Sequence, residues 1–293
     1  MHQKPTLIMN GRIAGQAWLA ETKQKISQLS TPPKLVIIQV GNHPASTVYI
    51  QKKMTAAAEV GAIVQHIQLA EAISQVELVN LINQFQTEQT HDGILVQLPL
   101  PNHINEEVIL KTLKAEFDVD GLSWETTAQT WMAKKFDPLA HVLPCTPKGV
   151  IRLLQHYGVS CASKNVVIIN RSNIVGKPLA AMLMALDATV TLCHSRTPNI
   201  SAHTLAADLV ISAVGRPNFI QPEQIATAAY VIDVSINFDA ENKIVGDVPK
   251  KSLLNKCAGY SPVPSGVGPM TVAAIFDNLY LLAKKKEEQK CPK

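Results

Sequence analysis

The sequence predicts an α/β protein of two domains, in each of which short apolar strands alternate with helices. Two observations lead to this fold class. The strands are continuous aliphatic and β-branched runs, typical of strands buried on both faces of a parallel sheet, and helical segments with recognisable ends separate them. With 293 residues, 46% of them hydrophobic and 17% charged, the chain can form the cores of two domains of ordinary size.

The first domain shows clear start and stop signals. Gly61 closes one expected helix, and Ser74 with Glu77 forms the capping-box pattern that opens the next. Pro99 and Pro101 end the last strand. In chain order we expect helix 11–29, strand 34–41, helix 44–60, strand 63–69, helix 74–88, strand 93–97 and helix 105–114.

An irregular segment, residues 117–149, is expected to lead into the second domain. Thr146 and Pro147 near its end suit the N-cap and first position of a helix that runs to about Tyr157. Further along we expect strand 166–169, a helix from Gly176, strands 189–193, 208–214 and 230–235, and a last helix 270–286.

Residues 164–179 have the strand, turn and helix order of a nucleotide-binding unit in a doubly wound sheet. The backbone N–H groups of such a turn and the start of its helix lie where a pyrophosphate binds. The usual G-x-G-x-x-G is not intact, because Asn170, Ser172 and, one residue late, Gly176 stand at its positions. On this motif alone, an ordinary buried strand and turn explains the segment about as well.

Two side chains of the first domain are candidates for proton transfer. Tyr49 and Lys53 are four apart on an expected helix and therefore share a face, and a lysine beside hydrogen-bonding partners can have its charge tuned. An isolated pair of this kind is more often a surface lysine beside a packed tyrosine. Short-chain dehydrogenases use the same spacing, but there the pair follows the nucleotide-binding unit, which disfavours that family.

Gln97 and the turn that contains Asp118, Asp120 and Gly121 are two further candidates. Gln97 ends an apolar strand, and ligands of open α/β sheets bind at strand carboxyl ends; an amide that caps loop backbone is an equal alternative. A carboxylate of the turn suits a two-point contact with a 2-amino-pyrimidinone edge, but Asp-Gly is also a common turn pair.

The segment His194, Ser195 and Arg196 follows an expected strand where an NAD-specific site would place an acidic residue. Residues 188–207 contain no Asp or Glu, and Arg171 stands in the phosphate turn. This combination favours a 2′-phosphate, and hence NADP, over a solvated basic turn.

The bulk properties exclude several other classes. A net charge of +4, partly from C-terminal lysines and without aromatics among the basic residues, does not indicate nucleic-acid binding. No apolar run approaches membrane-spanning length, and no signal peptide is evident. The cysteines are scattered without metal-ligand spacing, so we expect no metal and a reducing, cytoplasmic location.

Taken together, these motifs closely resemble the bifunctional methylenetetrahydrofolate dehydrogenase/cyclohydrolase (FolD-type) enzymes, over residues of about 8 to 283. The matching segments are VGNHPASTVYIQKK, AAEVGA, GILVQLPLP, DVDGL, PCTPKG, RSNIVGKPLA, ATVTLCHSRT, ADLVISAVGRPNFI, VIDVSIN, GDV and PVPSGVGPMT.

The resemblance implies an enzyme that oxidises 5,10-methylenetetrahydrofolate with NADP+ and hydrolyses the methenyl product to 10-formyltetrahydrofolate. It implies a folate-binding α/β catalytic domain (residues 1–143 and 270–293, the last helix packing back on it), a Rossmann-type NADP-binding domain (144–269), and a homodimer formed through the second domain. It also implies that the substrates are tetrahydrofolates, with polyglutamylated forms as candidates.

The resemblance also implies roles for single residues. Lys53 would handle protons, Tyr49 would orient the folate, Gln97 would tune Lys53, and Asp120 would hold the pterin edge. The cofactor would be bound by residues of the phosphate turn, the basic segment and the nicotinamide side, namely Asn170, Arg171, Ser172, Ser195, Ile236, Thr146 and Thr271.

Three positions depart from the family, which usually has glycine where Asn170, Ser235 and Ser265 stand. Asn tolerates a left-handed backbone better than most residues, so the turn at Asn170 can persist with less room for the phosphate. The departures keep two alternatives open: a cyclohydrolase with weak or lost dehydrogenase activity, and a non-catalytic folate- or nucleotide-binding paralogue.

Overall fold

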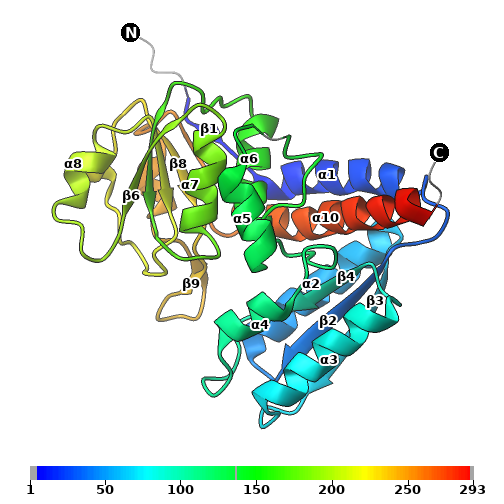
Figure 1. Ribbon diagram of the computed structural model, residues 1–293. Helices are drawn as coiled ribbons and strands as arrows, with labels where there is room; N and C mark the ends of the chain where they lie inside the picture. Colours follow the sequence, from blue (N-terminus) through cyan, green and yellow to red (C-terminus); the bar gives the residue numbers. More distant parts are fainter. Residues whose placement is uncertain (1–4, 136, 291–293) are drawn as a thin grey trace. The chain divides into compact units, whose positions relative to one another are not determined.

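The computed structural model describes residues 5–135 and 137–290, and its chain forms two compact units. The small-sheet unit contains residues 17–129, 137–145 and 272–290, and the large-sheet unit contains residues 5–16, 130–135 and 146–271. Four helices have residues in both units: α1 (Gly11–Ile26), α5 (Trp124–Met132), α6 (Cys145–His156) and α10 (Val267–Lys290). The architecture is α/β, as the strand and helix pattern predicts (Figure 1).

The small-sheet unit has parallel strands in the order β3-β2-β4. Its elements are β2 (Lys34–Val40), α2 (Pro44–Val60), β3 (Ile63–Leu69), α3 (Gln75–Glu88), β4 (Gly93–Val96) and α4 (Glu106–Thr112). On one face of the sheet, Val36 and Ile38 pack against Leu78 and Ile82 of α3 (Figure 1). The predicted capping box of α3 is confirmed, since Glu77 N donates to Ser74 Oγ over 3.2 Å and Ser74 N to the Glu77 carboxylate over 2.9 Å.

The last helix, α10, packs against the small sheet, as the resemblance implied. A Cβ on Gly93 of β4 would lie only 2.9 Å from Leu279 Cδ1, so α10 approaches this strand closely and a side chain there would displace Leu279. Asn278 donates to the carbonyls of Val119 and Leu143 over 3.0 and 2.8 Å, which fastens α10 to the Asp118–Asp120 turn. The buried Asp277 pairs with Lys25 of α1 at 3.1 Å, where α1 and α10 run side by side (Figure 1).

The large-sheet unit has parallel strands in the order β1-β11-β8-β7-β5-β6. Because the chain goes from β5 to β6 on one side and then crosses to β7 on the other, the strand order reverses between β5 and β7. Such a reversal forms the crevice in which doubly wound sheets bind nucleotides. The elements are β1 (Leu7–Ile8), β5 (Asn165–Ile169), α7 (Gly176–Met184), β6 (Thr189–Cys193), α8 (Ile200–Thr204), β7 (Leu209–Ser212), a 3-10 turn (Pro222–Gln224), β8 (Tyr230–Asp233), β9 (Asn237–Phe238), β10 (Ile244–Val245), α9 (Lys250–Leu253) and β11 (Gly259–Tyr260).

The structure differs from the sequence expectations in several places. Helix α5 lies in the segment expected to be irregular; Ser123 caps it by accepting a hydrogen bond from Thr126 N, 3.2 Å away. Helix α6 begins at Cys145, so Thr146 lies in its first turn and is not its N-cap. Strand β1 joins the large sheet beside β11, whereas the domain boundaries expected from the sequence place residues 1–16 in the first domain.

Of the three residues that replace family glycines, only Ser265 has a left-handed backbone, with φ of +82°. A side chain in this region costs about 1 kcal/mol relative to glycine. We expect Ser265→Gly to raise the free energy of unfolding by about 1 kcal/mol, measured by urea titration. Ser235→Gly is the matched control and should lower it, because Ser235 lacks a positive φ and its hydroxyl is hydrogen-bonded. Equal shifts in both variants would contradict this account.

Candidate active site

Lys53 of α2 and Gln97, the residue after β4, form a direct contact in the small-sheet unit. Lys53 Nζ donates to Gln97 Oε1 over 2.8 Å, and only 6% of Lys53 is exposed. Gln97 Nε2 donates to the Leu98 carbonyl over 2.6 Å, which directs the amide oxygen towards the lysine. Burial lowers the pKa of Lys53 from its ordinary value, because the charged ammonium loses solvation. The site therefore favours the neutral amine, the form that accepts a proton, more than water does.

Asp120 and Cys145 complete this cluster. The Asp120 carboxylate partly offsets the effect of burial on the pKa of Lys53. Burial raises the pKa of Asp120, while the Lys53 charge lowers it in turn. Cys145 N donates to the Asp120 carbonyl over 3.0 Å, and Cys145 Sγ donates to the Val119 carbonyl over 3.3 Å. Sequence reasoning gave Cys145 no role, although it stands in the PCTPKG segment.

Asp118 holds the turn that carries Asp120. Its buried carboxylate accepts hydrogen bonds from the backbone N–H groups of Gly121, Leu122 and Ser123, at 2.8, 3.1 and 2.7 Å. A parallel β-bridge joins Asp118 to Ile94 of β4. The turn is thus anchored to the strand that Gln97 follows. Sequence reasoning assigned the function of this turn to Asp120 and missed the anchoring role of Asp118.

Tyr49 lies one turn before Lys53 on α2 and is half-buried. Burial raises the pKa of its phenol, which therefore stays protonated at neutral pH. The exposed Lys52, and not Lys53, lies over the Tyr49 ring, 5.3 Å from its centroid. Tyr49 can thus offer a ring face and a hydroxyl donor beside the Lys53 cluster.

The candidate cofactor residues gather mainly at the carboxyl edge of the large sheet. Asn170, Arg171 and Ser172 follow β5, and Ser195 follows β6, the neighbouring strand, with Ile169 and Cys193 in register. Ile236 follows β8 and is 41% exposed. Thr146 and Thr271 contact each other through their hydroxyls at 3.3 Å.

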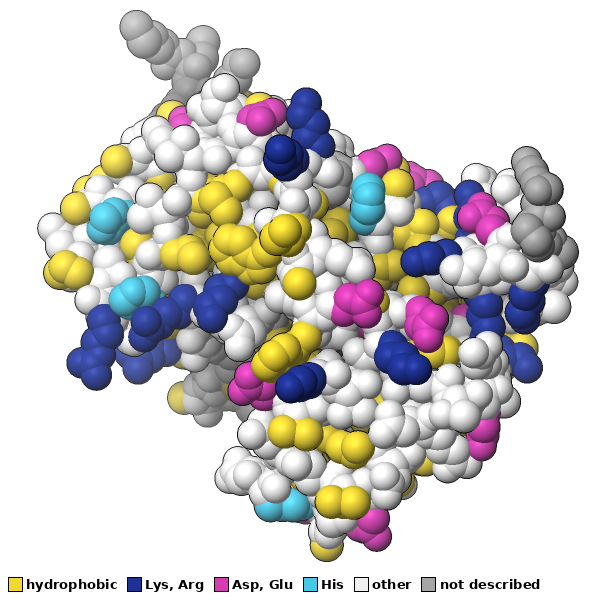
Figure 2. Space-filling view, in the orientation of Figure 1, with side chains coloured by type: hydrophobic (Ala, Val, Ile, Leu, Met, Phe, Trp, Pro, Cys, Tyr) yellow, Lys and Arg dark blue, Asp and Glu magenta, His cyan; other side chains and the backbone are white. Residues whose placement is uncertain are grey.

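This edge is also basic. Arg171, Arg196 and Arg216 are exposed and follow β5, β6 and β7 respectively. Figure 2 shows Lys and Arg side chains gathered on the part of the large-sheet unit near β9, which follows the carboxyl end of β8. Cations at the crevice of a doubly wound sheet suit an anionic ligand.

Asn170 corrects one expectation about the phosphate turn. Its side-chain Oδ1 accepts hydrogen bonds from Ser172 N at 2.7 Å and Gly176 N at 3.0 Å, and its Nδ2 donates to the Ala213 carbonyl at 2.6 Å. Two of the N–H groups expected to face a pyrophosphate therefore bind the chain's own amide, and Asn170 needs no left-handed backbone, because its φ is not positive. The asparagine side chain thus supplies an acceptor for two backbone N–H groups before and at the start of α7.

A second pair of carboxyl groups, Asp233 and Asp247, is buried where β8 ends. Burial and the neighbouring charge of Asp247 raise the pKa of Asp233 to about 7, against 3.8 for an ordinary aspartate. The folded state therefore holds this proton more tightly than the unfolded chain, and the resulting stability is lost as pH rises from about 4 to about 7.

We expect Asp233→Asn, which cannot titrate, to remove this pH dependence. Between pH 5 and 7 the unfolding free energy of the wild type should fall more steeply than that of the variant, by about 1.4 kcal/mol per pH unit. Urea titrations of both proteins at several pH values measure this difference. Parallel curves would show that Asp233 does not titrate in this range.

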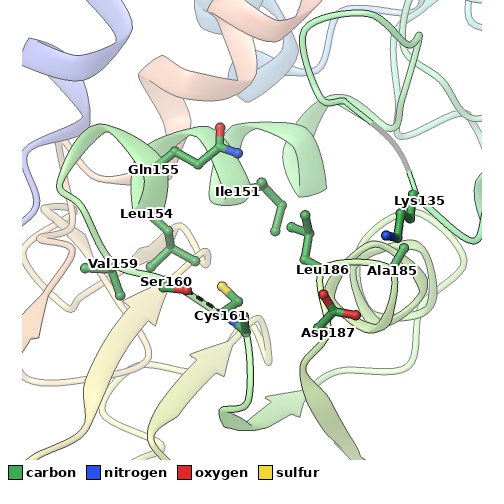
Figure 3. Close-up of a pocket in the computed structure, with 11 residues that line it drawn as sticks. Lys135, Ile151, Leu154, Gln155, Val159, Ser160, Cys161, Ala185, Leu186 and Asp187 are labelled. Atoms are coloured by element: carbon green, nitrogen blue, oxygen red, sulfur yellow. Dashed lines mark hydrogen bonds between the residues drawn. The ribbon is translucent and has the colours of Figure 1, made fainter.

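A cavity of about 390 Å³ in the large-sheet unit lies apart from the candidate residues. Ile151, Leu154, Cys161, Leu186 and Asp187 are among its lining residues, and the side chains of α6 face those of the α7–β6 connection across it (Figure 3). It lies near the amino ends of β5 and β6, whereas nucleotides bind at carboxyl ends. The cavity is therefore not the cofactor crevice.

Within residues 5–135 and 137–290, no cluster of His, Cys, Asp or Glu has the geometry to hold a metal ion. None of the helices in this described part of the chain is both long and apolar enough to cross a membrane.

Two family models match the chain. The model described as tetrahydrofolate dehydrogenase/cyclohydrolase, catalytic domain, matches residues 9–120, and the one described as tetrahydrofolate dehydrogenase/cyclohydrolase, NAD(P)-binding domain, matches residues 144–287. A bifunctional protein FolD from Moorella thermoacetica is 42% identical over 284 residues, which cover 96% of this chain and 100% of the relative.

Solved structures agree with these matches. A bifunctional FolD methylenetetrahydrofolate dehydrogenase/cyclohydrolase from Campylobacter jejuni has a TM-score of 0.91 and 37% identity, covering 96% of this chain and 99% of the other. The Trypanosoma brucei enzyme, complexed with NADP cofactor and inhibitor, has a TM-score of 0.90 and 32% identity, covering 96% and 98%.

Proposed function

Because the chain belongs to the tetrahydrofolate dehydrogenase/cyclohydrolase family, we propose that it oxidises 5,10-methylenetetrahydrofolate with NADP+ and hydrolyses the methenyl product to 10-formyltetrahydrofolate. The observation that carries this proposal is the buried Lys53, held at 2.8 Å by Gln97 beside Asp120. Its substrates are tetrahydrofolates, polyglutamylated forms included.

In the hydrolysis, Lys53 accepts a proton from the water whose oxygen bonds to the methenyl carbon, while the π electrons of the C=N⁺ bond move to N5. The bond between that carbon and N5 then breaks, and the proton returns from Lys53 to N5, which gives 10-formyltetrahydrofolate. The lowered pKa of Lys53 makes the neutral amine available for this step. Gln97 fixes the direction of Nζ, and Tyr49 orients the folate ring system. Asp120 binds the amino-pyrimidinone edge of the pterin through a two-point contact.

The residues of the large-sheet unit fit a dinucleotide with a 2′-phosphate. Arg171, Ser172 and Ser195 bind its phosphates at adjacent strand ends, where no acidic residue opposes them from 188 to 207. Asn170 shapes the phosphate turn, and the nicotinamide side is lined by Ile236, Thr146 and Thr271. Bound NADP+ supplies the hydride acceptor, while the chain's part is to position it.

We further propose that residues 1–143 and 270–293 bind folate and that residues 144–269 bind NADP, apart from the N-terminal strand that joins the large sheet. A homodimer through the second domain is supported by β6, an edge strand whose Val190 and Leu192 are half-exposed. Cys161, Cys193 and Cys257 are buried free thiols, which supports a reducing, cytoplasmic location.

Purified protein decides between the bifunctional enzyme and its nearest alternative. With 5,10-methylenetetrahydrofolate and NADP+, the bifunctional enzyme forms NADPH and 10-formyltetrahydrofolate. The alternative is a cyclohydrolase with weak dehydrogenase activity, favoured by the Asn170 amide that occupies two N–H groups of the phosphate turn. That protein would hydrolyse added methenyltetrahydrofolate but form almost no NADPH.

A further inference from the structure

Asp247, which follows β10, lies at the centre of a dense hydrogen-bond network in the large-sheet unit. It has no exposed surface. Its Oδ2 accepts from Ser212 Oγ, Ser235 Oγ and Val214 N, each at 2.7 Å. Its Oδ1 accepts from Gly215 N at 3.1 Å, Arg216 N at 2.9 Å and Asn237 Nδ2 at 3.0 Å.

The backbone donors of this network form one loop. Val214, Gly215 and Arg216 are consecutive and follow β7, so their N–H groups wrap around a single carboxylate. Asp247 thereby determines the path of this loop, just as Asp118 determines that of the Asp120 turn. Hydrogen bonds to an ionised acceptor are about twice as strong as neutral ones.

The loop lies on the nicotinamide side of the crevice. The strand order reverses between β5 and β7, and in a doubly wound sheet the pyrophosphate lies over the first strand of the nucleotide unit, here β5. The adenosine ribose lies towards the second strand, β6. The nicotinamide half must then extend over the carboxyl ends of β7 and β8, where this loop begins.

Ser235 adds a contact that a glycine at this position could not make. Its hydroxyl donates to Asp247 and accepts from Gly215 N at 3.1 Å. It therefore links the end of β8 to the loop after β7 on the side where the nicotinamide half extends.

We propose that Asp247 is a positioning residue that holds the loop of residues 214–216 in the shape that receives the nicotinamide half of the dinucleotide, and that Ser235 reinforces it. This inference rests on the proposed function, because it requires a bound dinucleotide. It assigns the network a role in cofactor binding and hydride transfer, and none in hydrolysis.

The test compares two probes of different length on the full chain. NADP+ spans both halves of the crevice, whereas adenosine 2′,5′-bisphosphate occupies the adenosine half alone. We expect Asp247→Asn to weaken NADP+ binding about 10- to 100-fold and to leave the Kd of adenosine 2′,5′-bisphosphate within about twofold, both measured by calorimetry. Hydrolysis of added methenyltetrahydrofolate should also stay within about twofold of wild type, which reports a folded small-sheet unit.

Ser235→Ala keeps the test decisive if Asp247→Asn does not fold, and it should weaken NADP+ binding about 2- to 10-fold. Ser201→Ala is its matched control: it removes a hydroxyl that accepts from Gln224 at 2.6 Å, outside the network, and should change neither Kd. Equal weakening of both probes, or of neither, would overturn the inference. A wild type that binds neither probe would overturn the proposed function as well.

Discussion

Replacing Lys53 by methionine should reduce hydrolysis of 5,10-methenyltetrahydrofolate by about 10²- to 10⁴-fold, the usual contribution of a positioned acid or base. Methionine fills a similar volume without a titratable group, so packing around the buried position is kept. The Gln97 amide loses its donor, but it still bonds to the Leu98 carbonyl. The rate of decay of methenyl absorbance, with circular dichroism as a check on folding, measures the effect.

Lys52→Met is the matched control for this prediction. Lys52 is adjacent in sequence, exposed, and lies over the Tyr49 ring at 5.3 Å. The same charge and the same atoms are removed, so hydrolysis should change by less than about twofold if only the buried amine acts as a base. A Lys53→Met protein that is folded and fully active would refute the catalytic role of the cluster. A wild type without measurable hydrolysis, whose behaviour Lys53→Met leaves unchanged, would favour the non-catalytic paralogue.

Much of the fold could be predicted because the decisive signals are local. Gly61 closes α2 and Ser74 caps α3, as the sequence predicts, and β3 has the expected bounds. Helix α5 was missed because its polar composition hides the Ser123 cap. Strand β1 was missed because it is only 2 residues long and exists through pairing with β11, which is distant in sequence.

In the candidate site, too, the sequence predicts some features and does not show others. The contact of Lys53 with Gln97 follows from a helical face and a strand end, which are readable patterns. The roles of Asp118 and Asp247 cannot be inferred from the sequence. Both carboxylates accept hydrogen bonds from backbone N–H groups, and the sequence does not show which N–H groups lack a partner. Asn170 is an example. From the sequence, asparagine in place of the family's glycine suggests only that less space remains for a phosphate, whereas the structure shows a specific pair of hydrogen bonds to the Asn170 side chain.

The preference for NADP+ should depend on Arg171 and Ser195. Arg171 follows β5 and Ser195 follows β6, and we propose that both side chains reach the ribose 2′-position of a dinucleotide from these adjacent strand ends. An arginine forms strong, charge-assisted contacts with a phosphate and has no such partner on a 2′-hydroxyl. Arg171→Ala should therefore raise the KM for NADP+ about 10- to 100-fold and that for NAD+ less than about threefold, with a smaller but parallel effect for Ser195→Ala.

Arg216→Ala separates this specific contact from a general loss of positive charge. Arg216 is also exposed at the carboxyl edge, but it follows β7, on the side of β5 away from β6. Its removal lowers the attraction of the edge for both dinucleotides, so the ratio of the two KM values should stay as in the wild type. If Arg171→Ala also leaves that ratio unchanged, the 2′-phosphate is not bound by this turn. The segment after β6, which contains no Asp or Glu, would then be a solvated basic loop. The absence of a carboxylate only allows a 2′-phosphate to bind, whereas a preference for NADP+ over NAD+ requires a cation beside that phosphate.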